Sequence, residues 1–235
     1  MSFVSTIRPV ARQGRSFMQA FAGHAGKIVR RIVNGPNDPF ANGTPITLQI
    51  PENQPLPRAK SPDGKVKLNL GCGDKILDGF INIDVAPSRK GKSPDYLSDV
   101  RHLTLPNAFA DEILSVHVIE HFYYWEAEAV LREWARVLKP GGTMILECPN
   151  LEAAARALLE QPEAAAGPGK EGQSTMWVFY GDPEWQDPLM CHRWGYTPKS
   201  LGALMEKVGF TMVRQEPAQF KKREPRDMRL VGVKR

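Results

Sequence analysis

The sequence predicts an α/β fold with a mostly parallel sheet, preceded by a long N-terminal extension. Three observations support this prediction. Short apolar segments typical of strands alternate with segments of helical periodicity from about residue 66 onward. A pair of glycines directly follows the first of these strands, as in sheets that bind a ligand at their carboxyl edge. The chain of 235 residues suits one domain with appendages, and no apolar run approaches the ~20 residues of a membrane span.

Residues 1–64 differ in composition from the rest, and we expect a basic extension followed by a proline-rich linker. Residues 1–37 carry basic side chains and no acid, at Arg8, Arg12, Arg15, Lys27, Arg30 and Arg31. Prolines recur through residues 34–64 and prevent a long helix there. With no continuous apolar run and no cleavage site, a secretory signal is not expected. The net charge of +5 is concentrated at the two ends, which makes nucleic acid a conceivable partner.

The remaining residues, 65–235, are expected to form the folded domain. Strands are predicted at residues 66–70, 81–85, 96–100, 111–117, 143–148, 211–216 and 228–233, where apolar residues cluster between turn residues. Helices are predicted at residues 120–138, 151–159 and 198–208 from their apolar periodicity. The first should end at Lys139-Pro140-Gly141-Gly142, and the last begins with Pro198 and precedes Gly209. Residues 161–175 read as a loop, and about 161–195 as an insert or lid.

The glycine pair and one acid indicate the kind of ligand. Gly71 and Gly73 after the first strand allow a ligand to approach the backbone, and Asp84 at the end of the second strand can accept hydrogen bonds from ribose hydroxyls. The dinucleotide fingerprint would need a third glycine where Ile76 stands, and a phosphate-binding Gly-Lys-Ser/Thr ending is absent. The pattern therefore favours a nucleoside-containing cofactor with little or no phosphate.

Three segments carry a family resemblance: LNLGCGDKILDGFINIDV, DEILSVHVIEHF and LREWARVLKPGGTMILECPN. Together they resemble the class I S-adenosylmethionine-dependent methyltransferases, and most closely a small bacterial and phage branch related to methyltransferase type 11 that is often linked to glycan genes. The resemblance spans about residues 66–216. It implies a Rossmann-like, seven-stranded, mostly parallel sheet with helices on both faces and an antiparallel last strand. It also implies S-adenosylmethionine as the cofactor.

The resemblance also implies roles for individual residues. The methionine and ribose part of the cofactor should be lined by Leu70, Gly71, Cys72 and Gly73. Asp84 with Val85 should hold the ribose, Asp99 with Val100 the adenine, and His117 should lie near the transferable methyl. Residues 75–80 leave little room for the long first helix that the family usually has.

A second group of residues has the spacing of a metal site. His117, Glu120 and His121 stand at i, i+3 and i+4, so they share one face if a helix begins by residue 117, and His192 could add a ligand. The expected ligands are Glu120, His121 and His192, with His117 as a further candidate. The pattern is similar to the ExxEH…H site of small-RNA 2′-O-methyltransferases and of ubiquinone O-methyltransferase relatives, with a histidine for the first glutamate, which favours zinc or another transition metal. Without a metal, His117, His121 or His192 is a candidate general base.

The acceptor is narrowed by what the sequence lacks. No Asp/Asn-Pro-Pro-Tyr/Phe motif for exocyclic amines occurs, and Cys148 precedes a proline and reads as a buried strand residue. These features favour O-methylation of a glycan or small-molecule hydroxyl, with N-methylation second. A metal-assisted RNA ribose 2′-O-methyltransferase and a non-catalytic module that binds cofactor or nucleic acid remain open alternatives. Three scattered cysteines favour a reducing, cytoplasmic location. No oligomeric state follows from the sequence.

Overall fold

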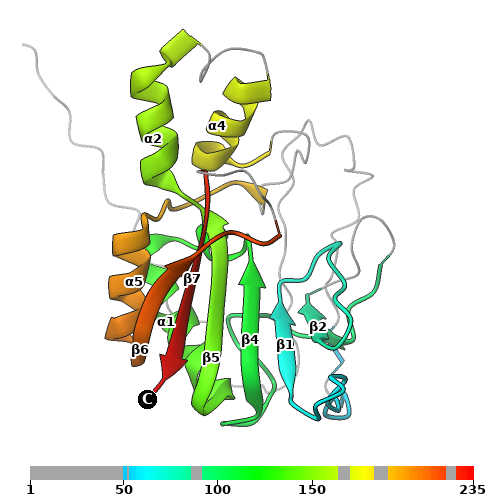
Figure 1. The fold of residues 1–235 in the computed structure, drawn as a ribbon. Helices are drawn as coiled ribbons and strands as arrows, with labels where there is room; N and C mark the ends of the chain where they lie inside the picture. Colours follow the sequence, from blue (N-terminus) through cyan, green and yellow to red (C-terminus); the bar gives the residue numbers. More distant parts are fainter. Residues whose placement is uncertain (1–49, 52, 86–91, 164–169, 183–189, 221–225) are drawn as a thin grey trace, which may run out of the picture.

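A computed structural model describes residues 50–235 except 52, 86–91, 164–169, 183–189 and 221–225. The expected basic extension therefore lies outside the described residues, apart from the last part of the proline-rich segment. Seven strands form one sheet: β1 (Lys67–Leu70), β2 (Ile81–Asp84), β3 (Tyr96–Leu97), β4 (Ala110–Val116), β5 (Leu138–Pro149), β6 (Phe210–Glu216) and β7 (Asp227–Lys234). Their order is β3-β2-β1-β4-β5-β7-β6, and β7 is antiparallel to both of its neighbours. The expected mostly parallel sheet with an antiparallel last strand is confirmed (Figure 1).

Two strands differ in length from their predicted ranges. β3 ends at Leu97 instead of residue 100, because Asp99 turns the chain: its backbone oxygen accepts from the N–H of His102. β5 begins at Leu138, earlier than residue 143, because Leu138 already pairs with Ala110 of β4. The pairing then shifts to Glu112 with Thr143, so residues 139–142 form an irregularity within the strand and not a separate turn.

The helices are η1 (Ile119–His121), α1 (Tyr124–Val137), α2 (Leu151–Glu160), α4 (Lys170–Tyr180) and α5 (Pro198–Lys207). The single helix predicted over residues 120–138 is wrong at its start. Phe122 and Tyr123 are extended, and the Glu126 carboxylate accepts the N–H of Tyr123, so α1 begins only at Tyr124. The prediction of a loop over residues 161–175 is also wrong in its last part, where α4 begins. Helix α4 packs against α2, and such packing outweighs the poor helix propensity of its glycine and serine.

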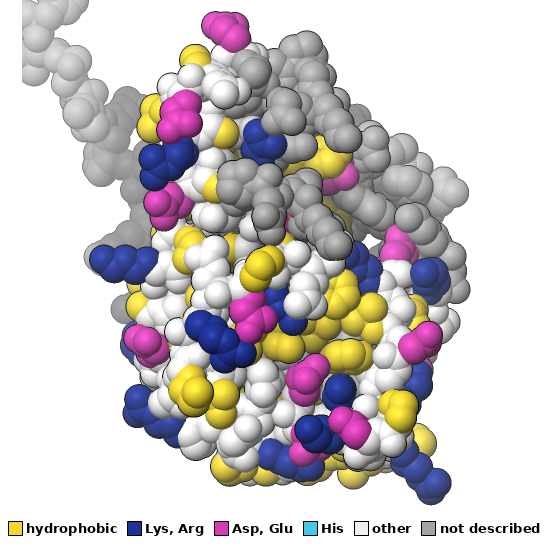
Figure 2. All heavy atoms as spheres, in the orientation of Figure 1, with side chains coloured by type: hydrophobic (Ala, Val, Ile, Leu, Met, Phe, Trp, Pro, Cys, Tyr) yellow, Lys and Arg dark blue, Asp and Glu magenta, His cyan; other side chains and the backbone are white. Residues whose placement is uncertain are grey.

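The strands divide their side chains between two apolar clusters, one on each face. Alternate residues such as Ile113, Met144 and Leu230 join the larger cluster, to which α1 and α5 contribute Trp134, Leu131, Leu201 and Met205. Leu114, Val116, Ile145 and Val231 form the second cluster, on the other face. The described hydrophobic residues packed against it come from loops: Leu77, Phe80 and Phe220. Figure 1 shows no helix in front of β1, β4 and β5, and Figure 2 shows hydrophobic side chains gathered on this face.

The proline-rich segment lies along the edge of the sheet. The side-chain amide of Gln54 donates to the backbone oxygen of Leu97 at 2.7 Å and accepts from the Leu97 N–H at 3.0 Å. Lys60 pairs with Asp95 at 2.9 Å just before β3. The segment thus covers the open backbone of the edge strand. Among the described residues, no helix combines the length and apolar character that a membrane crossing requires.

Candidate functional site

The turn after β1 leaves open backbone at the carboxyl edge of the sheet. Gly71 and Gly73 have φ of +66° and +47°, a region that favours glycine. The N–H groups of Gly71 and Cys72 donate to the backbone oxygen of Ile83, and the N–H of Gly73 donates to the Asp84 carboxylate at 2.8 Å. A Cβ added to Gly73 would meet no protein atom within 4 Å. The turn therefore presents bare backbone to open space, beside a fixed acid.

Asn82 holds this turn where the family usually has a helix. Its side-chain oxygen accepts from the Asn69 amide at 2.9 Å and from the N–H of Leu77 at 2.8 Å. Its amide group donates to the backbone oxygens of Leu77 and Phe80 and to the Asp95 carboxylate. Residues 71–80 thus form turns without a helix, as the short sequence between the two strands led us to expect.

The other expected cofactor residues lie around the same edge. Leu70 and Cys72 are buried, and burial, with the charge of Asp84 second, raises the pKa of the Cys72 thiol to about 12. The N–H of Val85 donates to the second oxygen of Asp84 at 2.7 Å. Asp99 is engaged in a bidentate ion pair with Arg101, and the backbone oxygen of Val100 accepts from the Trp134 ring at 2.7 Å. The adenine-binding role of Asp99 and Val100 stays a prediction.

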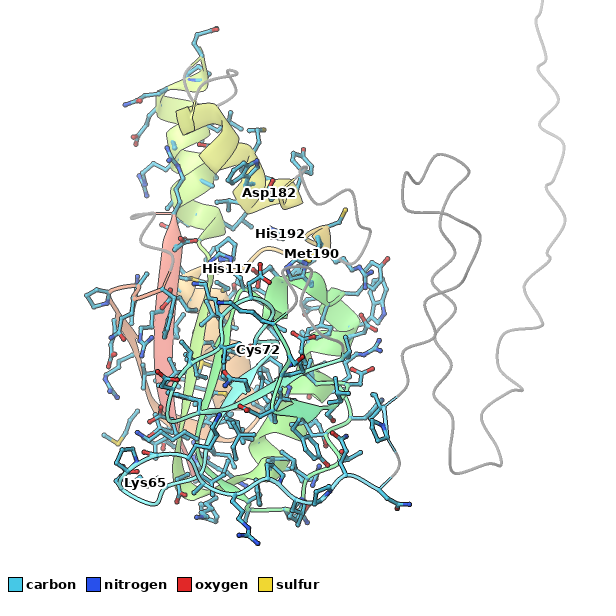
Figure 3. All side chains as sticks on the ribbon, turned by 90° about the vertical axis from the view of Figure 1, so that its right-hand side faces the viewer. Lys65, Cys72, His117, Asp182, Met190 and His192 are labelled. Carbon is cyan, nitrogen blue, oxygen red and sulfur yellow. The ribbon has the colours of Figure 1, made fainter. Side chains whose placement is uncertain are left out.

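A cluster of histidines and one glutamate lies past the end of β4. Ligand atoms of Glu120, His121 and His192 all lie within 4.8 Å of one another. The His121 and His192 rings meet edge to face with centroids 5.0 Å apart, although the residues are 71 positions apart. His192 comes from the segment after α4, and Figure 3 shows it near His117 and Met190 at the end of the sheet. The structure thus brings together the three residues predicted as metal ligands.

His117 also contacts Glu120 but is outside this group of three. It ends β4 with φ of +56°, so it is not helical, and the expected single face of His117, Glu120 and His121 does not form. Its Nδ1 is 3.1 Å from Glu120 Oε1, and its Nε2 is 3.3 Å from Asp227 Oδ1. Both ring nitrogens therefore face carboxylates that are almost fully buried.

The electrostatics of the cluster keep Glu120 ionised and His121 neutral near pH 7. Burial acts to raise the pKa of Glu120, but the contact with His117 and the other imidazoles outweigh it and lower that pKa to about 2. Burial is also the main cause that lowers the pKa of His121, against the charge of Glu120. A carboxylate beside neutral imidazole can accept a proton or bind a cation.

Two further residues of this region are buried, and one of them, Asp227, was missed as a site residue in the sequence. Asp227 begins β7, and because β7 is antiparallel, its first residue lies at the carboxyl edge, paired with Pro149. That position follows from the predicted antiparallel last strand, so the signal was present. Tyr196 is 2% exposed, and its hydroxyl has no hydrogen-bond partner among the described residues. Its position depends on a backbone bridge to Asn150, for which no sequence pattern exists.

Four large aromatic side chains are exposed next to the cluster: Tyr123, Tyr124, Trp125 and Trp194. The Tyr123 and Trp125 rings stack with centroids 4.6 Å apart and planes within 6°, and Trp125 is 74% exposed. The Arg193 guanidinium lies 4.9 Å from the centre of the Tyr123 ring. We call these four residues the aromatic patch. Its open ring faces are suited to stacking.

Comparisons with known proteins agree with the geometry. Residues 81–146 match the model of the methyltransferase domain family. A Mycolicibacterium smegmatis protein, described as a probable S-adenosylmethionine-dependent methyltransferase, is 32% identical over 103 residues, which are 37% of this chain and 39% of that protein. The match thus spans about two fifths of the relative.

Solved structures are similar to this chain at lower sequence identity. A methyltransferase from Archaeoglobus fulgidus has 16% identity and a TM-score of 0.49, with 72% of this chain and 86% of that chain covered. Human N-acetylserotonin methyltransferase has 16% identity and a TM-score of 0.49, with 72% and 47% covered. The matched residues 81–146 run from β2 into β5, through the parallel core of the sheet, so it is this part of the chain that is similar to the methyltransferase domain family.

Proposed function

We propose that this chain transfers a methyl group from S-adenosylmethionine to a hydroxyl group of a glycan or small molecule. The observation that carries the proposal is the pairing of the open Gly71–Gly73 turn with Asp84 at the carboxyl edge of β1 and β2. A Cβ at Gly73 would point into open space, which suits a ligand that contacts the backbone. The N–H groups of Gly73 and Val85 fix the Asp84 carboxylate at the edge of the sheet where an acid binds ribose hydroxyls in folds of this type.

The cofactor supplies a methyl group on a positively charged sulfur, which is already strongly electrophilic. The protein therefore has to orient the acceptor oxygen in line with the methyl and to remove its proton. The carboxyl edge near Val116 and His117 lies between the glycine turn and the histidine cluster, which is where the acceptor should be placed. Rate enhancement then comes mainly from positioning.

Of the three candidate bases, His121 and His192 fit better than His117. Both nitrogens of His117 face carboxylates, so its ring is engaged on both sides. His121 and His192 each direct Nδ1 to a backbone oxygen, which can only accept a hydrogen bond. The proton of each ring is therefore on Nδ1, and Nε2 keeps a lone pair that can take the acceptor proton.

The aromatic patch supports a ring-shaped acceptor. Trp125 and Tyr124 are the most exposed of its members, and Arg193 adds a positive charge beside Tyr123. Aromatic faces bind flat or ring-shaped groups, and sugars and bases both qualify. The histidine and glutamate cluster favours a second candidate within the same chemistry, in which a bound divalent metal assists transfer to an RNA ribose 2′-hydroxyl.

Calorimetric titration with S-adenosylmethionine and S-adenosylhomocysteine tests the cofactor site. Asp84→Ala removes two charge-assisted hydrogen bonds, about 1.5 kcal/mol each, and should weaken binding about 100-fold. Gly73→Ala should abolish binding, because its methyl group enters the open space. Gly141→Ala is the matched control, since Gly141 has φ of +76°, also meets no atom within 4 Å and stands at the start of β5. Both alanines cost about 1–2 kcal/mol of stability from positive φ, but only Gly73→Ala should affect binding.

Acceptor screening completes the test. Methyl transfer to hydroxylated glycans or small molecules supports the preferred class, and transfer to RNA that stops with a chelator supports the second candidate. Cofactor binding without turnover, together with salt-sensitive RNA binding, would instead identify a non-catalytic binding module. No binding of either cofactor form to the unchanged protein contradicts the proposal.

A further inference from the structure

We propose that Glu120, His121 and His192 bind one zinc-type divalent metal ion and leave one coordination position for water or the acceptor oxygen. Two imidazoles and one carboxylate are a donor set that catalytic zinc sites use. The proposal rests on geometry and burial. Metal binding does not depend on the methyl transfer proposed above; only the role of the metal rests on it.

The imidazole rings are oriented for metal binding by the backbone. His121 Nδ1 is 3.2 Å from the backbone oxygen of Cys191, and His192 Nδ1 is 2.9 Å from that of Val178. Metal-bound histidines in proteins usually donate their second N–H in this way, which fixes the tautomer and the ring plane. Both Nε2 lone pairs are therefore available on the same side as Glu120, and His192 Nε2 is 3.9 Å from Glu120 Oε1.

Glu120 supplies the negative charge, and imidazoles lie near it without forming a hydrogen bond. It is 2% exposed, and neither carboxylate oxygen has a hydrogen-bond partner among the described residues. His117 Nδ1 approaches one oxygen at 3.1 Å, outside hydrogen-bond geometry. Leaving a buried carboxylate without hydrogen bonds is costly, so a structure of this kind usually pairs it or binds a metal. A bound cation would supply the partner that both carboxylate oxygens lack among the described residues.

The surrounding backbone holds the three ligands together. The backbone oxygen of Glu120 accepts from the N–H groups of Arg193 and Trp194 at 2.8 and 3.2 Å, so the segment carrying His192 is tied directly to η1. Gly181, with φ of +86°, lets the end of α4 approach this segment: a Cβ there would be 2.3 Å from the backbone oxygen of Met190. A side chain at position 181 would push the His192 segment away from Glu120.

The distances require a small closure on binding. Ligand atoms about 2.1 Å from a tetrahedral ion stand about 3.4 Å apart. The separations of up to 4.8 Å must therefore contract by about 1.4 Å or less. The Nδ1 hydrogen bonds hold both rings, so the movement has to come from small shifts of η1 and of the segment that carries His192. The charge of the ion would then lower the pKa of a hydroxyl bound beside it and so replace a general base.

The test is zinc and cobalt binding to the full-length chain after chelator treatment. Zn²⁺ affinity is measured by competition with a chromogenic chelator, and Co²⁺ coordination by its visible absorption bands. The variants are His121→Ala, His192→Ala and Glu120→Gln. His102→Ala is the matched control, because His102 is exposed and outside the cluster. Binding of S-adenosylhomocysteine and the urea midpoint are measured on every variant to establish that each one folds.

The expected result is one Zn²⁺ per chain, tetrahedral-type Co²⁺ bands, and affinity at least about 100-fold weaker in each ligand variant but unchanged in His102→Ala. Absence of binding to the unchanged chain overturns the proposal, and so does binding that the ligand variants do not weaken, since the metal would then sit elsewhere. If zinc binds as expected but neither cofactor form does, the metal site stands and the proposed methyl transfer fails. If a cofactor form binds and zinc does not, the proposed metal site fails and the proposed cofactor site stands.

Discussion

Replacing Asn82 by alanine should loosen the glycine turn and weaken the fold at the same time. Asn82 is fully buried, and its side chain has five hydrogen-bond contacts of 2.8 to 3.3 Å with Asn69, Leu77, Phe80 and Asp95; its two N–H groups share three acceptors. These bonds fasten residues 71–80 to β1 and to the residue before β3. No helix supports this stretch, so the side chain of one residue carries much of that task.

The expected loss can be worked out bond by bond. A buried hydrogen bond contributes about 0.5–1.5 kcal/mol net, and an amide side chain has two N–H donors and two acceptor positions, so four full bonds give about 2–6 kcal/mol. The loss should lie near the lower end, because two partners keep other bonds. The Asn69 amide still donates to the backbone oxygen of Lys75, and Asp95 keeps Lys60 and the N–H of residue 82. We expect Asn82→Ala to lower the free energy of unfolding by about 3 kcal/mol.

Urea denaturation measures this loss, and calorimetry with S-adenosylhomocysteine measures its effect on the turn. Affinity should fall at least about tenfold, because Gly71 and Gly73 would no longer be held in place. Asn107→Ala is the control: Asn107 is exposed, accepts one bond from Arg136 and should cost less than about 1 kcal/mol. A loss in Asn82→Ala as small as in the control, with unchanged affinity, would refute the view that Asn82 replaces the missing helix.

Three further predictions concern acid stability, core packing and thiol chemistry. Burial alone would raise the pKa of Asp95, but hydrogen bonds from Asn82 and Lys60 lower that pKa below its ordinary value of 3.8. The ionised Asp95 therefore stabilises the fold above about pH 4, and this stabilisation is lost as the pH falls through the lowered pKa. In Asp95→Asn, the urea midpoint should fall less steeply with decreasing pH. Trp134→Phe should cost about 2–3 kcal/mol in urea titrations, because it leaves a small cavity and an unpaired backbone oxygen at Val100, whereas a cost below 1 kcal/mol would contradict this packing. At about pH 8 a thiol reagent should label Cys191 alone in the native chain and all three cysteines in urea, since Cys72 and Cys148 are buried with raised pKa values; fast native labelling of a second thiol would disagree with the structure.

The cofactor end of the candidate site could be predicted from short sequence patterns, because neighbouring strands build it. The glycine pair and Asp84 are separated by a dozen residues, and parallel pairing of β1 with β2 places them together without further information. The last strand placed Asp227 at the same edge, although its contact with His117 was not recognised. The positions of these residues could be predicted from the sequence, because strand direction alone decides which end of a strand lies at the site.

Other features depend on contacts that periodicity does not encode. The helical spacing of His117, Glu120 and His121 suggested one shared helical face, but His117 has a left-handed backbone and contacts Asp227 as well as Glu120. Asp99 had the position of an adenine ligand, yet Arg101 two residues later engages its carboxylate. His192 was predicted as a ligand from its place in the insert after the fifth strand and from the likeness to an ExxEH…H site. Its position depends on how residues after α4 return to η1, which only tertiary hydrogen bonds decide.

The glycine turn and the segment that leads to the histidine cluster are in direct contact, and this contact fixes their relative position. Val118, between His117 and η1, packs where a Cβ of Gly71 would be: the added atom would lie 2.5 Å from Val118 Cγ2. Glycine at position 71 is therefore needed for two reasons, its φ of +66° and the approach of the β4 turn. Because the two sites touch through this contact, a movement of the glycine turn shifts the backbone that carries Glu120 and His121. In the proposed reaction, the distance between the methyl donor and the proton acceptor would therefore depend on one close contact at the end of two neighbouring parallel strands, and in-line transfer requires such rigid placement.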